Sequence, residues 1–126
     1  MLSGLSPALD AEMFQFVSFA DGQLPAEAIA SAICCFREAE GVSLTLPRDG
    51  ALSLGFADES PMRQITLEVY SSLEGIGLTA AVARRLADNG IACNMIAAFH
   101  HDHVFVPADR AEEALALLQD LQREAG

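Results

Sequence analysis

The residues around Gly77 form the pattern with the clearest chemistry in this chain. An alternating apolar segment that ends near Tyr70 leads into Gly75-Ile76-Gly77, and a run of helix-forming residues begins at Leu78. The first turn of a helix leaves about four backbone N–H groups without intrahelical partners, and the helix dipole places partial positive charge there. Glycine has no β-carbon, so a ligand can approach its backbone closely. The pattern predicts a site for a small anion such as a carboxylate, and it favours recognition over catalysis.

A second group of candidate residues is the segment His100-His101-Asp102-His103. Imidazole and carboxylate groups are common zinc ligands. In an extended chain, however, His101 and His103 share one face while His100 points to the other, and the sequence has no second cluster with metal-ligand spacing. We therefore expect no metal ion and no cofactor. The segment is interpreted either as a self-satisfied cluster at a hairpin tip or as a ligand contact.

The sequence gives little support for a catalytic function of the same residues. Ser71 or Ser72 could combine with a histidine and Asp102 as a hydrolase triad, but the Gly-x-Ser-x-Gly elbow is missing. Gly75-Ile76-Gly77 also lacks the third glycine of a dinucleotide fingerprint, because position 80 is alanine. We expect no catalytic residue and no enzymatic activity.

Composition narrows the range of partners. The 126 residues are 52% hydrophobic, which is sufficient for the core of one globule. Eighteen acidic residues against seven basic ones give a net charge of −11, which disfavours binding to nucleic acid or to anionic membranes. We also expect neither a membrane span nor a signal peptide, because the apolar runs are short and the amino terminus lacks basic residues. The odd number of three cysteines, without the spacing of a zinc site, fits a reducing cytoplasm, and we expect Cys34 and Cys35 to be buried in a helix.

The elements that must position the candidate residues follow from apolar periodicity. Polar residues and a proline at 57–61 indicate an internal boundary, which gives an N-terminal half, 1–61, and a C-terminal half, 62–126. We predict strands at 13–19, 42–46, 65–70, 91–99 and 103–106, a tight turn at 100–102, helices at 25–41 and 78–89, a short helical turn at 49–56, and a closing helix from 109.

The order of these elements indicates two related halves. The second half reads β-α-β-β-α, one strand short of the ferredoxin-like order, and the first half offers β-α-β and a short helix. No strict sequence repeat supports a duplication. Each half alone would have an open sheet edge and a thin core, so we expect the halves to complete one another in an α+β fold.

Several motifs resemble the ACT-domain family. Ser71-Ser72-Leu73-Glu74, Gly77-Leu78-Thr79, Ile91-Ala92-Cys93-Asn94 and the segment from His100 to Pro107 occur in the family's order. Phe36-Arg37-Glu38-Ala39-Glu40-Gly41 is similar to a segment of small bacterial stand-alone ACT proteins. The resemblance implies tandem ferredoxin-like βαββαβ units with helices on one face of a mainly antiparallel sheet. It also implies a regulatory module that binds an amino acid at a contact between domains or subunits.

The resemblance further implies roles for individual residues. Backbone amides of Gly77 and Leu78 would bind the ligand's carboxylate, Ser71 or Ser72 would contribute hydroxyl contacts, and Asp102 would receive the ammonium group. Glu74 would pair with a basic ligand side chain or simply be exposed near the helix start. The predicted ligand-binding residues are Ser71, Ser72, Glu74, Gly75, Ile76, Gly77, Leu78, Thr79, His101 and Asp102.

Together these observations predict a cytoplasmic regulatory protein that binds a free amino acid or a similar small zwitterion. We expect it to be a homodimer, to contain no further domain for regulation in cis, and to regulate a separate protein in trans. The alternative is an ACT-type oligomerisation or protein-interaction module that binds no metabolite.

Overall fold

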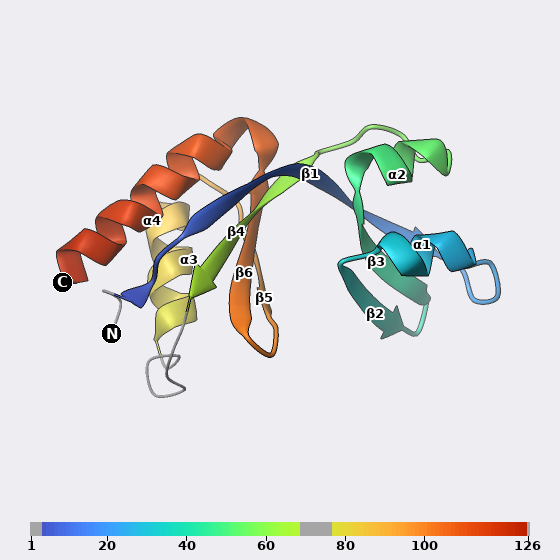
Figure 1. Ribbon diagram of the computed structural model, residues 1–126, viewed down its shortest axis with the longest axis horizontal. Helices are drawn as coiled ribbons and strands as arrows, with labels where there is room; N and C mark the ends of the chain where they lie inside the picture. The colour runs from blue at the N-terminus through green and yellow to red at the C-terminus, as the bar shows by residue number, and fades with distance from the viewer. Residues whose placement is uncertain (1–3, 69–76, 126) are drawn as a thin grey trace. The chain divides into compact units, whose positions relative to one another are not determined.

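The computed structural model describes residues 4–68 and 77–125 (Figure 1). The chain divides into two compact units. Unit 1 comprises Met1–Ala11 and Met62–Gly126, and unit 2 comprises Glu12–Pro61. Strand β1 (Ala8–Phe19) belongs to both, because its first residues lie in unit 1 and the rest in unit 2. The division into halves 1–61 and 62–126 stays a prediction. In the structure, the residues up to Ala11 group with the second half.

Unit 1 is built from β4 (Met62–Glu68), α3 (Leu78–Asp88), β5 (Asn94–Ala97), β6 (His101–Pro107), the short 3-10 helix η2 (Ala108–Arg110) and α4 (Ala111–Ala125). Its strands follow the order β1-β4-β6-β5, in which β4 and β5 both pair antiparallel with β6. The amide of Glu68 donates to the carbonyl of Leu5, and the Arg63 guanidinium donates to the carbonyl of Asp10. The chain's first strand thus supplies the strand that the β-α-β-β-α order of the second half lacks.

Both long helices of unit 1 pack on one face of its sheet (Figure 1). Alternate residues of β4 and β6 point to this face, as the period of two predicts. They meet the predicted stripe of α3 and one side of α4, and fully burying such a side chain contributes about 1.5–3 kcal/mol. The buried residues are Ile65, Leu67, Val104, Val106, Leu78, Val82, Leu86, Ala111, Ala114, Leu118 and Leu121.

Unit 2 repeats this design on a smaller scale. It contains the second part of β1, α1 (Ala26–Ser31), β2 (Cys34–Glu38), β3 (Gly41–Pro47) and α2 (Arg48–Ser53), with antiparallel strands in the order β2-β3-β1. Its core consists of Val17, Ala28, Leu44, Leu46 and Ala51. Helices on one face of a mainly antiparallel sheet confirm the predicted α+β fold.

The predicted helix at 25–41 is wrong. Helix α1 ends at Ser31, and residues 34–38 form strand β2 instead. The amide of Ile33 donates to the carbonyl of Thr45, which draws the chain into pairing with β3. Tertiary pairing therefore overrides the helical spacing of the apolar residues, and Cys35 is exposed rather than buried.

The β5–β6 hairpin is confirmed, but its turn lies earlier than predicted. The amide of Ala98 donates to the carbonyl of His101, so Phe99 and His100 form the tip and Asp102 lies within β6. Phe99 was predicted to be the last residue of a strand, yet it occupies this turn and 95% of it is exposed. Strand β5 is shorter than predicted because Ile91 completes the end of α3 and is buried against unit 1's core.

Candidate functional site

The start of helix α3 has the geometry expected of a carboxylate-binding corner. Gly77 occupies the N-cap with φ = 87°, a left-handed conformation that favours glycine. The first intrahelical bond runs from the amide of Ala81 to the carbonyl of Gly77, so the amides of the three preceding helical residues face the helix start. The first turn holds no acidic side chain. Leu78 is buried and fixes this turn to the core, while Gly77 and Thr79 are exposed.

Asp102 lies on the sheet face that carries α3. It is the second residue of β6 and pairs with Leu67 on β4 and with Ala97 on β5. Val104 and Val106 share its face by strand alternation, and both are buried against the helices. Asp102 itself is half-buried. Figure 1 shows the start of α3, the end of β4 and the β5–β6 turn at the same end of unit 1.

His101 does not share this face. It lies next to Asp102 in β6, so its side chain points to the opposite side of the sheet, where its ring is 6.3 Å from that of His103. The Thr66 hydroxyl is hydrogen-bonded to Nδ1 of His103 at 3.1 Å. Burial lowers the pKa of His103, the charge of His101 lowers it further, and Asp102 opposes both effects. The structure therefore separates His101 from Asp102, although the two are adjacent in sequence.

The remaining predicted site residues are Ser71, Ser72, Glu74, Gly75 and Ile76, and they lie outside the described residues. Within residues 4–68 and 77–125, no group of three or more histidine, cysteine, aspartate or glutamate residues could hold a metal ion. Three of the ten predicted residues, Gly77, Leu78 and Thr79, thus form the described part of the corner. Asp102 shares their end of unit 1.

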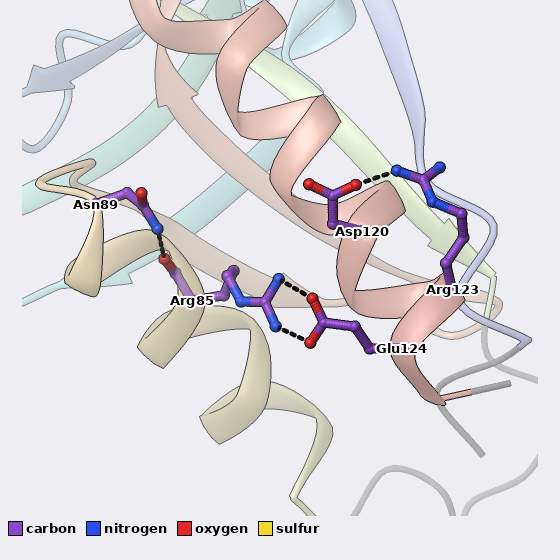
Figure 2. A network of polar contacts seen from close by, with 5 residues as sticks. All are labelled: Arg85, Asn89, Asp120, Arg123 and Glu124. Atoms are coloured by element: carbon purple, nitrogen blue, oxygen red, sulfur yellow. Dashed lines mark hydrogen bonds and ion pairs between the residues drawn. The ribbon is translucent and has the colours of Figure 1, made fainter.

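Polar contacts that sequence reasoning missed hold α3 in place (Figure 2). The Arg85 guanidinium donates to both carboxylate oxygens of Glu124 on α4, at 3.1 and 2.5 Å. This hydrogen bonding raises the pKa of Arg85 above its ordinary value. Asn89 donates to the carbonyl of Arg85, and on α4 Arg123 pairs with Asp120. Opposite charges on two amphipathic helices were visible in the sequence, but their 39-residue separation gave no signal for pairing.

Gly90 terminates helix α3, as the sequence predicted. Gly90 has φ = 72°, its amide donates to the carbonyl of Ala87, and the amide of Ile91 donates to the carbonyl of Leu86. These two bonds are the pair expected of a Schellman motif. The Arg110 guanidinium also donates to the carbonyls of Asn89 and Gly90. Both ends of the helix that presents the corner are therefore fixed within unit 1.

The comparisons with known proteins agree with this architecture. Two models of the ACT domain match the chain, one over residues 1–63 and the other over residues 59–120. The chain belongs to the ACT-domain family. Among curated proteins, none matches it. A solved protein of unknown function from Vibrio cholerae, described as a possible transport protein, is 35% identical over 96% of this chain and 92% of its own, with a TM-score of 0.84.

More distant solved structures share the fold. The ligand-free regulatory subunit of aspartate kinase from Thermus thermophilus is 15% identical, with a TM-score of 0.66 over 93% of this chain and 97% of its own. Aspartokinase III of E. coli, in complex with aspartate and ADP, is 16% identical with a TM-score of 0.60. That match covers 90% of this chain and 32% of the kinase. The Thermus thermophilus neighbour is itself a regulatory subunit. No described helix of the present chain is long and apolar enough to cross a membrane.

Proposed function

We propose that this chain is a regulatory ACT protein that binds a free amino acid or a similar small zwitterion at the start of α3. One observation carries the proposal. A helix start with a left-handed Gly77 and no acidic side chain lies at the same end of unit 1 as Asp102, which is on the sheet face that bears the helix. A donor cluster and an anionic acceptor at one end of a unit suit a ligand with opposite charges a few ångströms apart.

The roles follow from the chemistry of each group. The amides of the α3 first turn, including that of Leu78, bind the carboxylate, with the helix dipole adding to the attraction. Asp102 accepts hydrogen bonds from the ammonium group. Charge-assisted hydrogen bonds contribute about 1.5–3 kcal/mol each, so two of them with partial burial of the ligand give an affinity in the micromolar range. His101 faces away and makes no ammonium contact in this arrangement.

The proposal keeps the predicted roles of the residues before Gly77. Ser71 or Ser72 contributes hydroxyl contacts, Glu74 pairs with a basic ligand side chain, and Gly75, Ile76 and Thr79 belong to the same proposed set of ligand-binding residues. The protein catalyses no reaction, acts in the cytoplasm, forms a homodimer and transmits ligand binding to a separate protein in trans. The Thermus thermophilus neighbour supports a regulatory role, because it is the regulatory subunit of aspartate kinase.

A thermal-shift screen with each of the twenty amino acids at millimolar concentration tests this function. A ligand at 100 times its Kd stabilises the folded chain by about 2.7 kcal/mol, so a true ligand raises Tm clearly. The variant Asp102→Asn should reduce the shift strongly. Asp109→Asn is the matched control, because it removes the same charge from an exposed residue just beyond the other end of β6 and should keep the shift. If Asp102→Asn responds like the unmodified chain, the assignment of Asp102 is wrong.

The second candidate function is a protein-interaction module without a metabolite. Phe36 on edge strand β2 is 68% exposed, and Phe16 on β1 is 44% exposed. Both lie on the face of the unit 2 sheet opposite its helices, since they pair with Ser43 and Thr45 of β3 while Leu44 and Leu46 face the core. Exposed aromatic residues on a sheet face favour a protein contact. Self-association in analytical ultracentrifugation, with no shift from any amino acid, would select this function.

A further inference from the structure

The two units match each other residue by residue along their strands. In unit 2, Phe14 of β1 pairs with Pro47, the last residue of β3; in unit 1, Met62 of β4 pairs with Pro107, the last residue of β6. Both prolines have nearly the same backbone conformation, with φ and ψ of −51° and 137° for Pro47 and −53° and 135° for Pro107. The equivalence therefore extends from strand pairing to backbone geometry.

The residues that follow the two prolines repeat as well. Each proline opens the pattern Pro-x-Asp-x-Ala, and the alanines, Ala51 and Ala111, are both fully buried in the core of their unit. The β2–β3 hairpin of unit 2 and the β5–β6 hairpin of unit 1 have the same register, because Cys34 pairs with Thr45 and Asn94 pairs with Phe105. Each residue of the β2–β3 hairpin thus corresponds to the residue 60 positions later in the β5–β6 hairpin, as 34 corresponds to 94 and 47 to 107. This offset identifies the unit 2 counterpart of any residue in β5 or β6.

The counterpart of Asp102 is Val42. Val42 lies on the helix-bearing face of its sheet, as Asp102 does, and packs against the core of unit 2. An isopropyl group cannot accept a hydrogen bond from an ammonium group. Unit 2 therefore lacks the acidic half of the proposed site. The position equivalent to Asp102 holds an apolar side chain that packs against the core of unit 2.

The counterpart of the α3 corner is also less suited to an anion. Helix α1 follows β1 as α3 follows β4, but it is only six residues long and its N-cap is Pro25, which has no N–H to donate. Its first turn carries Glu27, whose charge repels a carboxylate, whereas the first turn of α3 has no acidic residue. The donor half of the site is thus weaker in unit 2, since the amide of Ala28 also donates to the carbonyl of Pro25, and the acidic half is absent.

We propose that each chain binds one zwitterion, in unit 1 alone, and that unit 2 is a copy of the same fold that binds none. The inference rests on the proposed function and adds its stoichiometry and the unit responsible. In a homodimer this gives two ligands for two chains. The conformational response to the ligand therefore begins at α3 and β6.

Isothermal titration calorimetry of the full chain with each amino acid that raises Tm tests this inference. We expect one ligand per chain, an affinity at least tenfold weaker in Asp102→Asn, and an unchanged stoichiometry and Kd in Glu27→Gln, which removes the acid of the α1 first turn. Backbone amide NMR shifts on ligand addition should be concentrated at Gly77–Ala80 and Asp102, with none at Ala26–Ala28 or Val42.

The possible failures are distinct from one another. Two ligands per chain, or ligand-induced shifts at Ala26–Ala28 that change in Glu27→Gln, would overturn the one-site inference and leave the regulatory function standing. If none of the twenty amino acids raises Tm or gives heat on titration, the proposed function fails and the one-site inference fails with it.

Discussion

Replacing Gly41 by alanine should destabilise unit 2 strongly, although Gly41 lies directly beside a hairpin turn. Gly41 begins β3 directly after the two-residue turn from β2 and has φ = 147°, a conformation that side chains rarely adopt. A β-carbon added there would lie 2.2 Å from the carbonyl oxygen of Phe19 and 3.1 Å from its carbonyl carbon. Both contacts are with backbone, so β1 or β3 must move, and the pairing of Phe19 with Val42 is lost.

The cost follows from these two effects. Forcing a residue with a side chain into such a conformation costs about 1–3 kcal/mol, and displacing a paired backbone adds to it. We expect Gly41→Ala to lose about 3 kcal/mol or more and to lower Tm by about 10 °C in a chain of this size. Circular dichroism during heating and urea unfolding at 25 °C measure both quantities.

Gly50→Ala is the matched control. Gly50 lies inside α2, its φ is ordinary, and no atom lies within 4 Å of an added β-carbon. Alanine is the better helix former, so this variant should gain about 0.5–1 kcal/mol. A Gly41→Ala chain that melts within about 2 °C of the unmodified one would refute the steric argument. The same steric argument explains why the Phe-Arg-Glu-x-Glu-Gly segment ends in glycine, because that glycine is Gly41.

Three further outcomes are expected. Because burial and His101 lower the pKa of His103, the unfolded chain binds more protons near pH 6.5, and stability should fall as pH drops below that value. Urea midpoints from pH 8 to 5 measure this fall, and His103→Gln should flatten it; an unchanged slope would contradict the assignment. Leu118→Ala should cost about 2–5 kcal/mol in urea unfolding, because Leu118 on α4 is fully buried in the core of unit 1. A loss below 1 kcal/mol would count against the described core. In the native chain, a thiol reagent followed by mass spectrometry should modify exposed Cys35 first and Cys93 last, because burial raises the pKa of Cys93; the reverse order would be inconsistent with the structure.

The two units share the residues that set their fold but differ at the residues suited to a ligand. Both units keep the proline that ends β3 or β6 and the buried alanine that follows it, because these residues set the backbone and the core. The groups suited to a zwitterion differ between the units at the positions of Asp102 and Glu27. Unit 2 could then be retained for folding or for contact with a partner, a role that its exposed Phe36 suits.

Local patterns were sufficient for much of unit 1. The stripe of Leu78, Val82 and Leu86 predicted helix α3 and its buried face, and Gly90 predicted where the helix ends. Alternation along β4 predicted its inward residues for the same reason, since a helix or strand that buries one face must repeat its apolar residues with the period of its backbone. Family motifs then identified the corner at Gly77, whose left-handed conformation the glycine allows.

Long-range contacts decided what these patterns left open. The residues from Ile33 to Phe36 have helical spacing, yet the pairing of β2 with β3 makes them extended, and no local signal reports a partner strand. Only the register of β6 against β4 showed that Asp102 faces the helices and His101 does not, because a shift of one residue in a turn exchanges the two faces of a strand. The sequence by itself determined which elements form and which residues suit a ligand. The tertiary structure decided which of those residues share a face, because that depends on hydrogen bonds between segments distant in the chain.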